Sequence, residues 1–263
     1  TEKMNLFKKA IFFTDVHFGL KSNSRTHNQD CLDFVDFVIK TGKEQNCETC
    51  VFLGDWHNNR ASLQIGTLNY SVQAIDKLSA AFDQIIFIPG NHDEHYRDTR
   101  EMNSVVWAKK YENVRMFDEI TTVDDVCITP WLVGDEHKQI KKVEAKYMFG
   151  HFELPSFYMN AMVQMPDVGD LRRDDLKCET VFTGHFHKRQ TSKNITYIGN
   201  AFPHNYADVG DDDRGCMILD WGKDPVYIPW PDAPKYRKFR LSEILEDTDR
   251  LLLSNMYCRV EID

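Results

Sequence analysis

Long apolar stretches are absent from the sequence, which removes the usual signature of a membrane protein. No run approaches the roughly 18 uninterrupted apolar residues that a spanning helix needs. The first ten residues, TEKMNLFKKA, contain no extended apolar core of the kind found in signal peptides. Because both features are missing, we expect an intracellular, cytoplasmic protein.

The cysteines are too scattered for a disulfide scaffold. The chain has 7 of them in 263 residues, an odd number, whereas small secreted domains carry a dense and even set. Cys47 and Cys50 form one C-x-x-C pair, but no second pair completes a zinc knuckle. We therefore expect reduced thiols, with Cys50 packed inside a strand.

The chain also lacks an excess of positive charge. Its 32 lysines and arginines face 41 aspartates and glutamates, for a net charge of -9. This balance argues against a protein that coats nucleic acid through a broad basic surface, but it leaves room for a local site where bound cations supply the positive charge. No G-x-x-x-x-G-K-[ST] phosphate loop occurs, so any use of ATP would need a partner.

The first two hundred residues alternate short β-branched or aromatic runs with helical patterns, as is typical of an α/β domain. Apolar residues recur at helical spacing over residues 29–44 and 68–78. Strands are predicted at residues 10–14, 49–53, 84–88, 126–129, 146–149, 180–183, 195–198 and 216–219.

Proline density rises over residues 225–234 (PVYIPWPDAP), which indicates a linker or an edge segment. We place a boundary near residue 230, with a main domain over 1–229 and a linker and C-terminal extension over 230–263. The extension contains a basic cluster, a predicted helix over 242–254 and a strand-like end, YCRVEID. That last strand either pairs with the main sheet or belongs to a second domain that begins here. The basic cluster consists of Lys235, Arg237, Lys238 and Arg240.

Histidine, aspartate and asparagine gather where the predicted strands end. Ligands bind at strand ends of α/β sheets because rigid strands hold loop residues from distant parts of the chain in one crevice. Five loops therefore converge in this prediction. Their polar residues are Asp15 and His17, Asp55, Asn91 and His92, His151, and His185 and His187.

These residue types suit a pair of metal ions. Two divalent cations about 3.5 to 4 Å apart repel each other, so an anionic ligand must lie between them. Asp55 is the candidate for that bridge, with four histidine nitrogens and the oxygens of Asp15 and Asn91 as the other ligands. Glycine precedes four of the positions, which suits tight strand-to-loop turns and leaves room for metal and phosphate near the backbone.

The same residues carry a resemblance. DVH at Asp15–His17, GD at Gly54–Asp55, GNHD at Gly90–Asp93, GH at Gly150–His151 and GHFH at Gly184–His187 resemble the five blocks of the calcineurin-like metallophosphoesterases, in that family's order. A single GD or GH carries no weight, but five ordered blocks that follow strands are specific. The resemblance implies a four-layer α-β-β-α sandwich, in which two central mixed β-sheets are flanked by helices and a dinuclear site lies at one edge.

The resemblance also implies a role for each residue. Asp15, His17 and His187 would hold the first metal, Asn91, His151 and His185 the second, and Asp55 both. A metal-bridging hydroxide would attack phosphorus. His92 would meet the substrate phosphate and help the leaving oxygen depart, Asn91 would share that contact, and Asp93 would orient the loop. Nitrogen and oxygen ligands without thiolate favour Mn2+, with Fe, Zn and Mg as alternatives.

One position departs from the family pattern. Many relatives carry aspartate or histidine three positions after the bridging aspartate, where it supports the catalytic histidine, but this sequence has Asn58 there, after His57. A neutral amide can orient an imidazole but cannot raise its pKa as a carboxylate does. We therefore count Asn58 and His57 among the candidate catalytic residues.

Further details resemble DNA exonuclease subunits of the SbcD type and related phage recombination nucleases. DVHFGL is similar to their opening D-x-H-x-G, and Gly199 through Arg214–Gly215 is similar to a late segment of those nucleases. This resemblance implies DNA as substrate, a role in DNA repair or recombination, an SbcC-type ATPase subunit as a partner and, as an option, a homodimer. The chain would then end inside a truncated capping domain.

Two other functions stay open. The acidic charge suits a phosphodiesterase or phosphatase acting on a small nucleotide, and some members of this fold have become catalytically silent scaffolds. Arg60 is the candidate for contact with a DNA backbone. Trp56 either lines the site or packs in the apolar core. The histidines outside the five blocks, His27, His95, His137 and His204, are predicted to be solvated loop residues.

Overall fold

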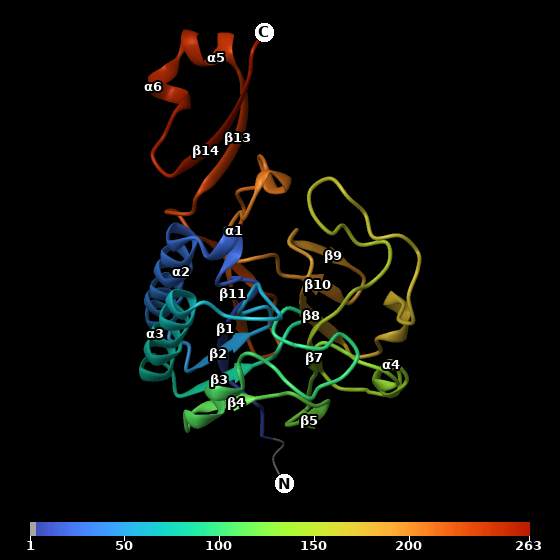
Figure 1. The fold of residues 1–263 in the computed structure, drawn as a ribbon. Coiled ribbons are helices and arrows are strands. Elements are labelled where there is room, and N and C mark those ends of the chain that lie inside the picture. Colours follow the sequence, from blue (N-terminus) through green and yellow to red (C-terminus); the bar gives the residue numbers. More distant parts are fainter. Residues whose placement is uncertain (1–3) are drawn as a thin grey trace.

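The alternating pattern builds two six-stranded mixed sheets in the computed structural model, which describes residues 4–263 (Figure 1). Residues 1–3 open the N-terminal stretch in which no apolar leader is predicted, and they lie outside the described residues. All eight predicted strands and both helices predicted before residue 230 are present, with ends shifted by up to four residues. The missed strands of the two main sheets are short, and runs of three or four residues carry little periodicity. A six-residue strand over the basic cluster, residues 235–240, was also missed, because its charged residues do not form an apolar run.

The first sheet has the order β12-β11-β1-β2-β3-β4. Strands β1 to β4 run parallel, whereas β11 and β12 are antiparallel to their neighbours. The proline-rich segment supplies β12, which is an edge strand, as one of the two predictions for it stated. The bounds are β1 Lys9–Phe13, β2 Thr49–Phe52, β3 Gln84–Phe87, β4 Val114–Met116, β11 Gly215–Asp220 and β12 Val226–Pro229.

The second sheet has the order β5-β6-β7-β8-β10-β9, with parallel pairing from β6 to β10 and an antiparallel strand at each edge. Its bounds are β5 Thr121–Val123, β6 Val126–Ile128, β7 Tyr147–His151, β8 Thr180–Gly184, β9 Gln190–Ser192 and β10 Ile195–Tyr197.

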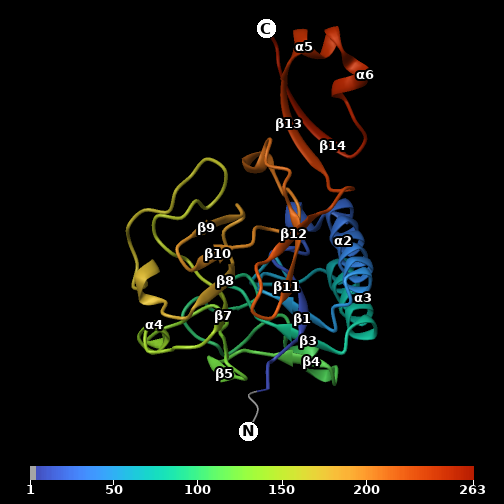
Figure 2. The same cartoon turned by 180° about the vertical axis from the view of Figure 1, so that it is seen from behind.

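Helices α2 (Arg25–Glu44) and α3 (Ile65–Ala81) cover the outer face of the first sheet, and the short α4 (Glu136–Ile140) lies on the opposite side of the molecule (Figures 1 and 2). Ser24 caps α2 by accepting a hydrogen bond from the backbone of His27. The remaining short helices are α1 Leu20–Asn23, η1 Val106–Lys110, η2 Arg173–Asp175 and η3 Tyr206–Asp208. The fold class is therefore the predicted one, two mixed sheets flanked by helices, with long loops beside α4 on the second sheet.

Three apolar clusters hold these layers together. Phe12, Val51 and Ile86 of the first sheet meet Phe149 and Phe182 of the second in the central cluster. A second cluster lies between the first sheet and α2 and α3, and a third covers the outer face of the second sheet. Because β1, β2, β3, β7 and β8 are buried on both faces, the ends of these strands are fixed in position, and the loops that follow them inherit that rigidity. All seven cysteines are free, and Cys50 is packed in β2 as predicted.

Residues after Pro229 form a separate two-stranded parallel sheet, β13 Lys235–Arg240 with β14 Met256–Glu261 (Figure 1). The C-terminal strand thus pairs with the basic cluster and not with the main sheet. The predicted helix over 242–254 is wrong as one element, because Asp247 adopts a non-helical backbone between α5 (Leu241–Glu246) and α6 (Thr248–Leu251). Only Ile244 of these two helices is buried, so little apolar packing favours a continuous helix. No helix within residues 4–263 is long and apolar enough to cross a membrane.

Candidate active site

The loops that follow β1, β2, β3, β7 and β8 meet at one edge of the two sheets. They enclose a cavity of about 300 Å³, here called the histidine cavity. The loops after β1 and β2 stay hydrogen bonded to each other beyond the strands, since His17 N–H donates to the carbonyl of Asp55. All seven residues predicted as metal ligands come together at this cavity or directly beneath it. Its lining includes His17, Asp55, His92, His185 and His187.

One half of the cluster centres on His151, which is fully buried. His151 Nε2 lies 2.9 Å from Asn91 Oδ1 and 3.3 Å from Asp55 Oδ2, and His185 Nδ1 lies 3.1 Å from Asn91 Oδ1. Ligand bonds of about 2.1 Å around one cation place neighbouring donor atoms about 3.0 to 3.4 Å apart. The spacing in this half, called the His151 half, is therefore that of a cation site.

The other half centres on His17. His17 Nε2 lies 3.3 Å from Asp15 Oδ1 and 3.5 Å from Asp55 Oδ2, and His187 Nε2 lies 3.8 Å from Asp15 Oδ1. The second oxygen of Asp15 is occupied, because it accepts from the Thr14 hydroxyl and from the backbone N–H of His185. Asp55 Oδ2 reaches both halves, as a bridging carboxylate must. We call this second set the His17 half.

The histidines are oriented by partners on their other ring nitrogen. His17 Nδ1 pairs with the Asn58 side-chain oxygen at 3.1 Å, and His151 Nδ1 with the carbonyl of Leu53 at 2.7 Å. His185 Nε2 lies 3.6 Å from the Glu153 carboxylate. An acceptor on one nitrogen fixes the ring and directs the other nitrogen inward, which is how metal-binding histidines are generally held. The sequence analysis did not single out Glu153, because it lies outside the five blocks.

Backbone strain concentrates at the same residues. Asp15, His17, Asp55 and His185 all have positive φ, at 53°, 54°, 62° and 97°. Residues with a Cβ rarely adopt this conformation, which costs on the order of 1–3 kcal/mol each and is kept where the surroundings impose it. Four strained residues that aim side chains at one cavity indicate a functional site.

Two glycines allow the loops to approach closely. A Cβ on Gly90 would lie 2.3 Å from Asp55 Oδ1, and one on Gly54 would lie 2.4 Å from His151 Nδ1. The sequence predicted room near the backbone for metal and phosphate. The space is instead taken by the predicted ligands themselves, so these glycines set the distance between Asp55 and its partners.

The buried carboxylates give the cavity a negative potential. Burial alone would raise the pKa of Asp55, but the imidazoles of His151 and His17 hold it well below its usual range. Conversely, burial opposes the charge on His151, yet Asp55 and Asp15 raise the pKa of that histidine to about 9. Both shifts favour positive charge at the centre of the cluster, and a divalent cation would supply it.

The donor set fits hard or borderline divalent cations. It contains carboxylate, amide and imidazole groups without thiolate. Asn91 Oδ1 faces the carboxylate of Asp55 and the ring nitrogens of His151 and His185, which are acceptors once they carry no proton, as metal ligands must. A cation at their centre would be bound by that oxygen, whereas without one the rotated amide would donate to the same atoms. Lone pairs from four residues thus converge on one point.

His92 adjoins the predicted ligands, and one of its ring nitrogens lies within 4.8 Å of a donor atom of His17 and of Asp55. Its backbone N–H donates to Asp55 Oδ1, and its Nδ1 lies 2.7 Å from the carbonyl of Asn58. A carbonyl only accepts, so Nδ1 carries the proton and Nε2 is available to the cavity. Burial lowers the pKa of His92. The prediction that the Asn58 amide supports His92 needs correction, because the backbone of Asn58 does so while its side chain holds His17.

His57 does not occupy the position predicted for a catalytic residue. It is fully buried, and its two ring nitrogens lie 2.7 Å from Ser104 Oγ and 2.8 Å from Ser71 Oγ. Burial lowers its pKa to about 3, so the ring stays neutral. With both nitrogens used in the protein interior, His57 has no atom left for a substrate, and its predicted catalytic share is withdrawn.

Asp93 connects the loops. Its carboxylate accepts hydrogen bonds from the backbone N–H groups of Asp55, Trp56, His57 and Gly90. It thereby ties the loop after β2 to the loop after β3, in line with its predicted orienting role. Trp56 is fully buried among Phe13, Phe18, Phe52 and Phe87, and of its two predicted roles it has the one in the core.

Arg60 lies near the cavity but does not line it. Its guanidinium donates to the carbonyl of Glu94 at 3.3 Å, and the side chain is partly exposed. The structure therefore leaves Arg60 at the rim, where a long polyanion could meet it.

Two histidines outside the five blocks are buried, against prediction. His27 is in α2 and its Nε2 lies 3.1 and 2.9 Å from the carbonyls of Val16 and His17, so it braces the loop after β1. His204 lines the histidine cavity, and its ring is 5.5 Å from that of His17 and 5.4 Å from that of His187. Burial holds its pKa well below the usual range. The only hint in the sequence was its place in the late segment that resembles the nucleases.

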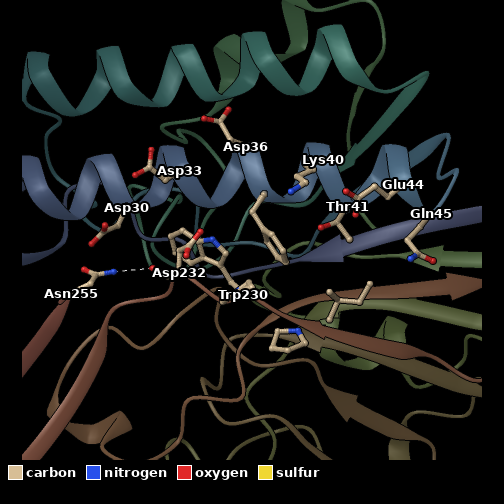
Figure 3. Close-up of a pocket in the computed structure, with 14 residues that line it drawn as sticks. Asp30, Asp33, Asp36, Lys40, Thr41, Glu44, Gln45, Trp230, Asp232 and Asn255 are labelled. Atoms are coloured by element: carbon tan, nitrogen blue, oxygen red, sulfur yellow. Dashed lines mark hydrogen bonds between the residues drawn. The ribbon is translucent and has the colours of Figure 1, made fainter. Parts of the chain in front are cut away.

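A larger hollow of about 800 Å³ lies between α2 and the segment that continues from β12 (Figure 3). Three carboxylates from successive turns of α2 and Asp232 surround it, and Trp230 forms part of its floor. Burial and Asp33 raise the pKa of Asp30 to about 6. Among its lining residues within 4–263 there is no histidine, so this hollow lacks the donors of the histidine cavity. The three carboxylates are Asp30, Asp33 and Asp36.

A comparison with curated proteins finds a relative encoded by a phage. The chain is 29% identical over 222 residues to exonuclease subunit 1 of Enterobacteria phage T4, a match that covers 81% of this chain and 64% of that protein. The chain therefore spans less than two thirds of the length of this relative.

Solved structures with a similar arrangement include a nuclease, MPE, from Pseudomonas putida, at 16% identity, TM-score 0.37 and coverage of 68% of this chain and 61% of that one. The phosphoesterase Yfce from E. coli is 14% identical, with a TM-score of 0.43 and coverage of 86% of this chain and 94% of that one. The protein TT1561 of Thermus thermophilus is 8% identical, with a TM-score of 0.49 and coverage of 85% of this chain and 99% of that one.

The calcineurin-like phosphoesterase family matches residues 8–189, the stretch that runs from β1 to the end of the last of the five blocks. Members of this family are hydrolases that typically bind divalent metals, which agrees with the donor set of the histidine cavity. The chain belongs to the calcineurin-like phosphoesterases.

Proposed function

We propose that the chain is a metal-dependent phosphodiester hydrolase that cleaves DNA, as a nuclease subunit of the SbcD type. The observation that carries the proposal is the position of Asp55, whose Oδ2 lies 3.5 Å from His17 Nε2 in one half of the site and 3.3 Å from His151 Nε2 in the other. Two cations, for which we propose Mn2+, would share this carboxylate. Asp15, His17 and His187 would complete one set of ligands, and Asn91, His151 and His185 the other.

Bound divalent cations supply a water of lowered pKa and neutralise charge on a phosphate group. The chain itself positions the side chains that surround the cations. Asp93 holds the two central loops in register, and Asn58 directs His17 inward. His92 presents Nε2 to the cavity from a ring fixed by the Asn58 carbonyl, so it is placed to meet a phosphate oxygen or the departing oxygen.

Three features support DNA over a small phosphodiester. The relative in phage T4 is named as an exonuclease subunit. Arg60 lies near the cavity, and the two-stranded sheet after residue 230 carries the exposed side chains of Lys238 and Arg240. Since phosphate contacts need local basic groups, these side chains offer a path for a backbone despite the net charge of -9. We also propose that residues 230–263 form part of a DNA-contacting cap and that an ATPase subunit of the SbcC type is a partner.

The direct test compares substrates with Mn2+ present: linear duplex DNA, single-stranded DNA, closed plasmid and bis-p-nitrophenyl phosphate. The proposal predicts cleavage of DNA ends, with His92→Ala at least about 100-fold slower. Turnover of bis-p-nitrophenyl phosphate without any DNA cleavage would favour the small-nucleotide phosphodiesterase. If no substrate is cleaved, with or without an ATPase partner, the chain is a silent scaffold and the proposal fails.

A further inference from the structure

His204 is a buried imidazole without a partner. Its side chain lies in the loop after β10 and is only 1% exposed. Within residues 4–263, neither Nδ1 nor Nε2 of this ring has a hydrogen-bond partner. Buried polar groups in folded proteins are nearly always paired, so an imidazole that leaves both nitrogens unpaired points to a ligand that belongs there.

The loop that carries His204 is held firmly in place. The backbone N–H of His204 donates to the Asp208 carboxylate at 3.0 Å, and its carbonyl accepts from the Tyr236 hydroxyl at 2.9 Å. Asp208 in turn faces the buried guanidinium of Arg214, which also donates to Asn200 Oδ1 at 2.6 Å. The position of the ring is therefore set by the fold.

The ring points at the His17 half of the site. One donor atom from each of His17, His187 and His204 lies within 4.8 Å of the other two. His27 is also adjacent, with ring centroids 5.3 Å apart, but its Nε2 is already directed at the carbonyls of Val16 and His17. The other two members of this group, His17 and His187, are both predicted metal ligands.

We propose that His204 is an additional ligand of the cation in the His17 half, alongside Asp15, His17, His187 and the shared Asp55. This inference rests on the cation site of the proposed function but not on its substrate. The His17 half would then offer five protein ligands and the His151 half four, so the two cations would differ in affinity and in the number of positions left for water or substrate.

The test uses the full chain and Mn2+ alone, without substrate. His204→Ala and His204→Gln are titrated with Mn2+ by calorimetry, with His137→Ala as the matched control, because the partly exposed His137 ring pairs with the carbonyl of Gly134 in its own turn. We expect one of two Mn2+ sites to weaken by about tenfold or more in both His204 variants, and the control to match the wild type. Circular dichroism of the metal-free variants verifies that they fold.

A spectroscopic readout separates ligation from a general loss of stability. Pulsed EPR of protein loaded with Mn2+ counts the coordinated imidazole nitrogens, and we expect one fewer in His204→Ala for the affected site. Unchanged Mn2+ affinity and nitrogen count in folded His204→Ala overturn the inference; a higher KM in that case would make His204 a phosphate contact instead. If the wild type binds two Mn2+ with His204 coordinated but cleaves no DNA, the proposed function fails and this inference stands.

Discussion

The two halves of the histidine cavity differ in how completely they are built. In the His151 half, His151 is fully buried and the donor atoms lie 2.9 to 3.3 Å apart. In the His17 half, His187 Nε2 is 3.8 Å from Asp15 and its side chain is 28% exposed. The tighter half takes its residues from the ends of β2, β3, β7 and β8. Its central residue, His151, is the last residue of the buried strand β7, so packing of the core fixes its position.

This difference teaches how the site is preorganised. A half whose donors already stand at ligand spacing gains a cation with little movement, whereas the other must contract around it. We therefore expect the His151 half to be rigid and the His17 half to adjust. The predictions below test this comparison.

The largest effect should come from Asp55→Ala, because Asp55 is the one residue that both halves share. We expect Mn2+ content to fall from two ions per chain to none or nearly none, and turnover to vanish with it. Metal analysis after gel filtration measures this directly. One fully retained Mn2+ would mean that the halves do not depend on a common carboxylate.

His92→Ala should leave both halves loaded while removing most of the turnover, by about 10²–10⁴-fold. The reason is that His92 contacts Asp55 through its backbone N–H and offers its ring to the cavity, so the substitution removes no ligand. Metal content and the cleavage rate are measured on the same sample. If the purified variant contained no metal, His92 would be part of the cation site.

A matched pair of substitutions addresses the halves one at a time. Asn58→Ala removes the acceptor of His17 Nδ1, and Glu153→Gln removes the charge beside His185 Nε2. Each should weaken Mn2+ binding in its own half by about 10-fold, with the other half unaffected, because outer partners typically contribute at that level. Calorimetric titration distinguishes the two sites. Equal losses in both halves for either variant would contradict the assignment of Asn58 to His17.

The smallest effect is expected at the rim. Arg60→Ala should weaken DNA binding modestly and lower the slope of its salt dependence by about 1, because one phosphate contact is lost. Arg115→Ala, on β4 at the edge of the first sheet, is the matched control and should leave the slope unchanged. An unchanged slope in Arg60→Ala would remove Arg60 from the DNA path.

The sequence predicts the residues of both halves, because Asp15, His17 and His187 follow predicted strands within blocks just as the ligands of the His151 half do. Asn91, His151 and His185 each stand at a strand end within a block, and the same rule that placed them there also predicted β3, β7 and β8. The two-sheet fold follows from apolar runs that are buried on both faces. These are local patterns, so one chain suffices to recognise them.

The features of the site that the sequence did not predict depend on contacts between residues far apart in the chain. His204 and His27 looked like solvated loop residues, because nothing within a few positions of either shows that η3, Tyr236 and the loop after β1 enclose them. His57 stands beside the bridging aspartate in sequence, yet the chain turns its ring toward Ser71 and Ser104 in the interior. The direction in which a side chain points after a strand depends on backbone φ, as at Asp55, and the pattern of residue types does not encode it.

Anomalous scattering from a crystal grown with Mn2+ tests the central claim most directly. The account predicts two manganese peaks about 3.5 to 4 Å apart on either side of Asp55 Oδ2, one bound by Asn91, His151 and His185 and the other by Asp15, His17 and His187. An empty cavity would contradict it. So would manganese bound elsewhere while these side chains still contact one another.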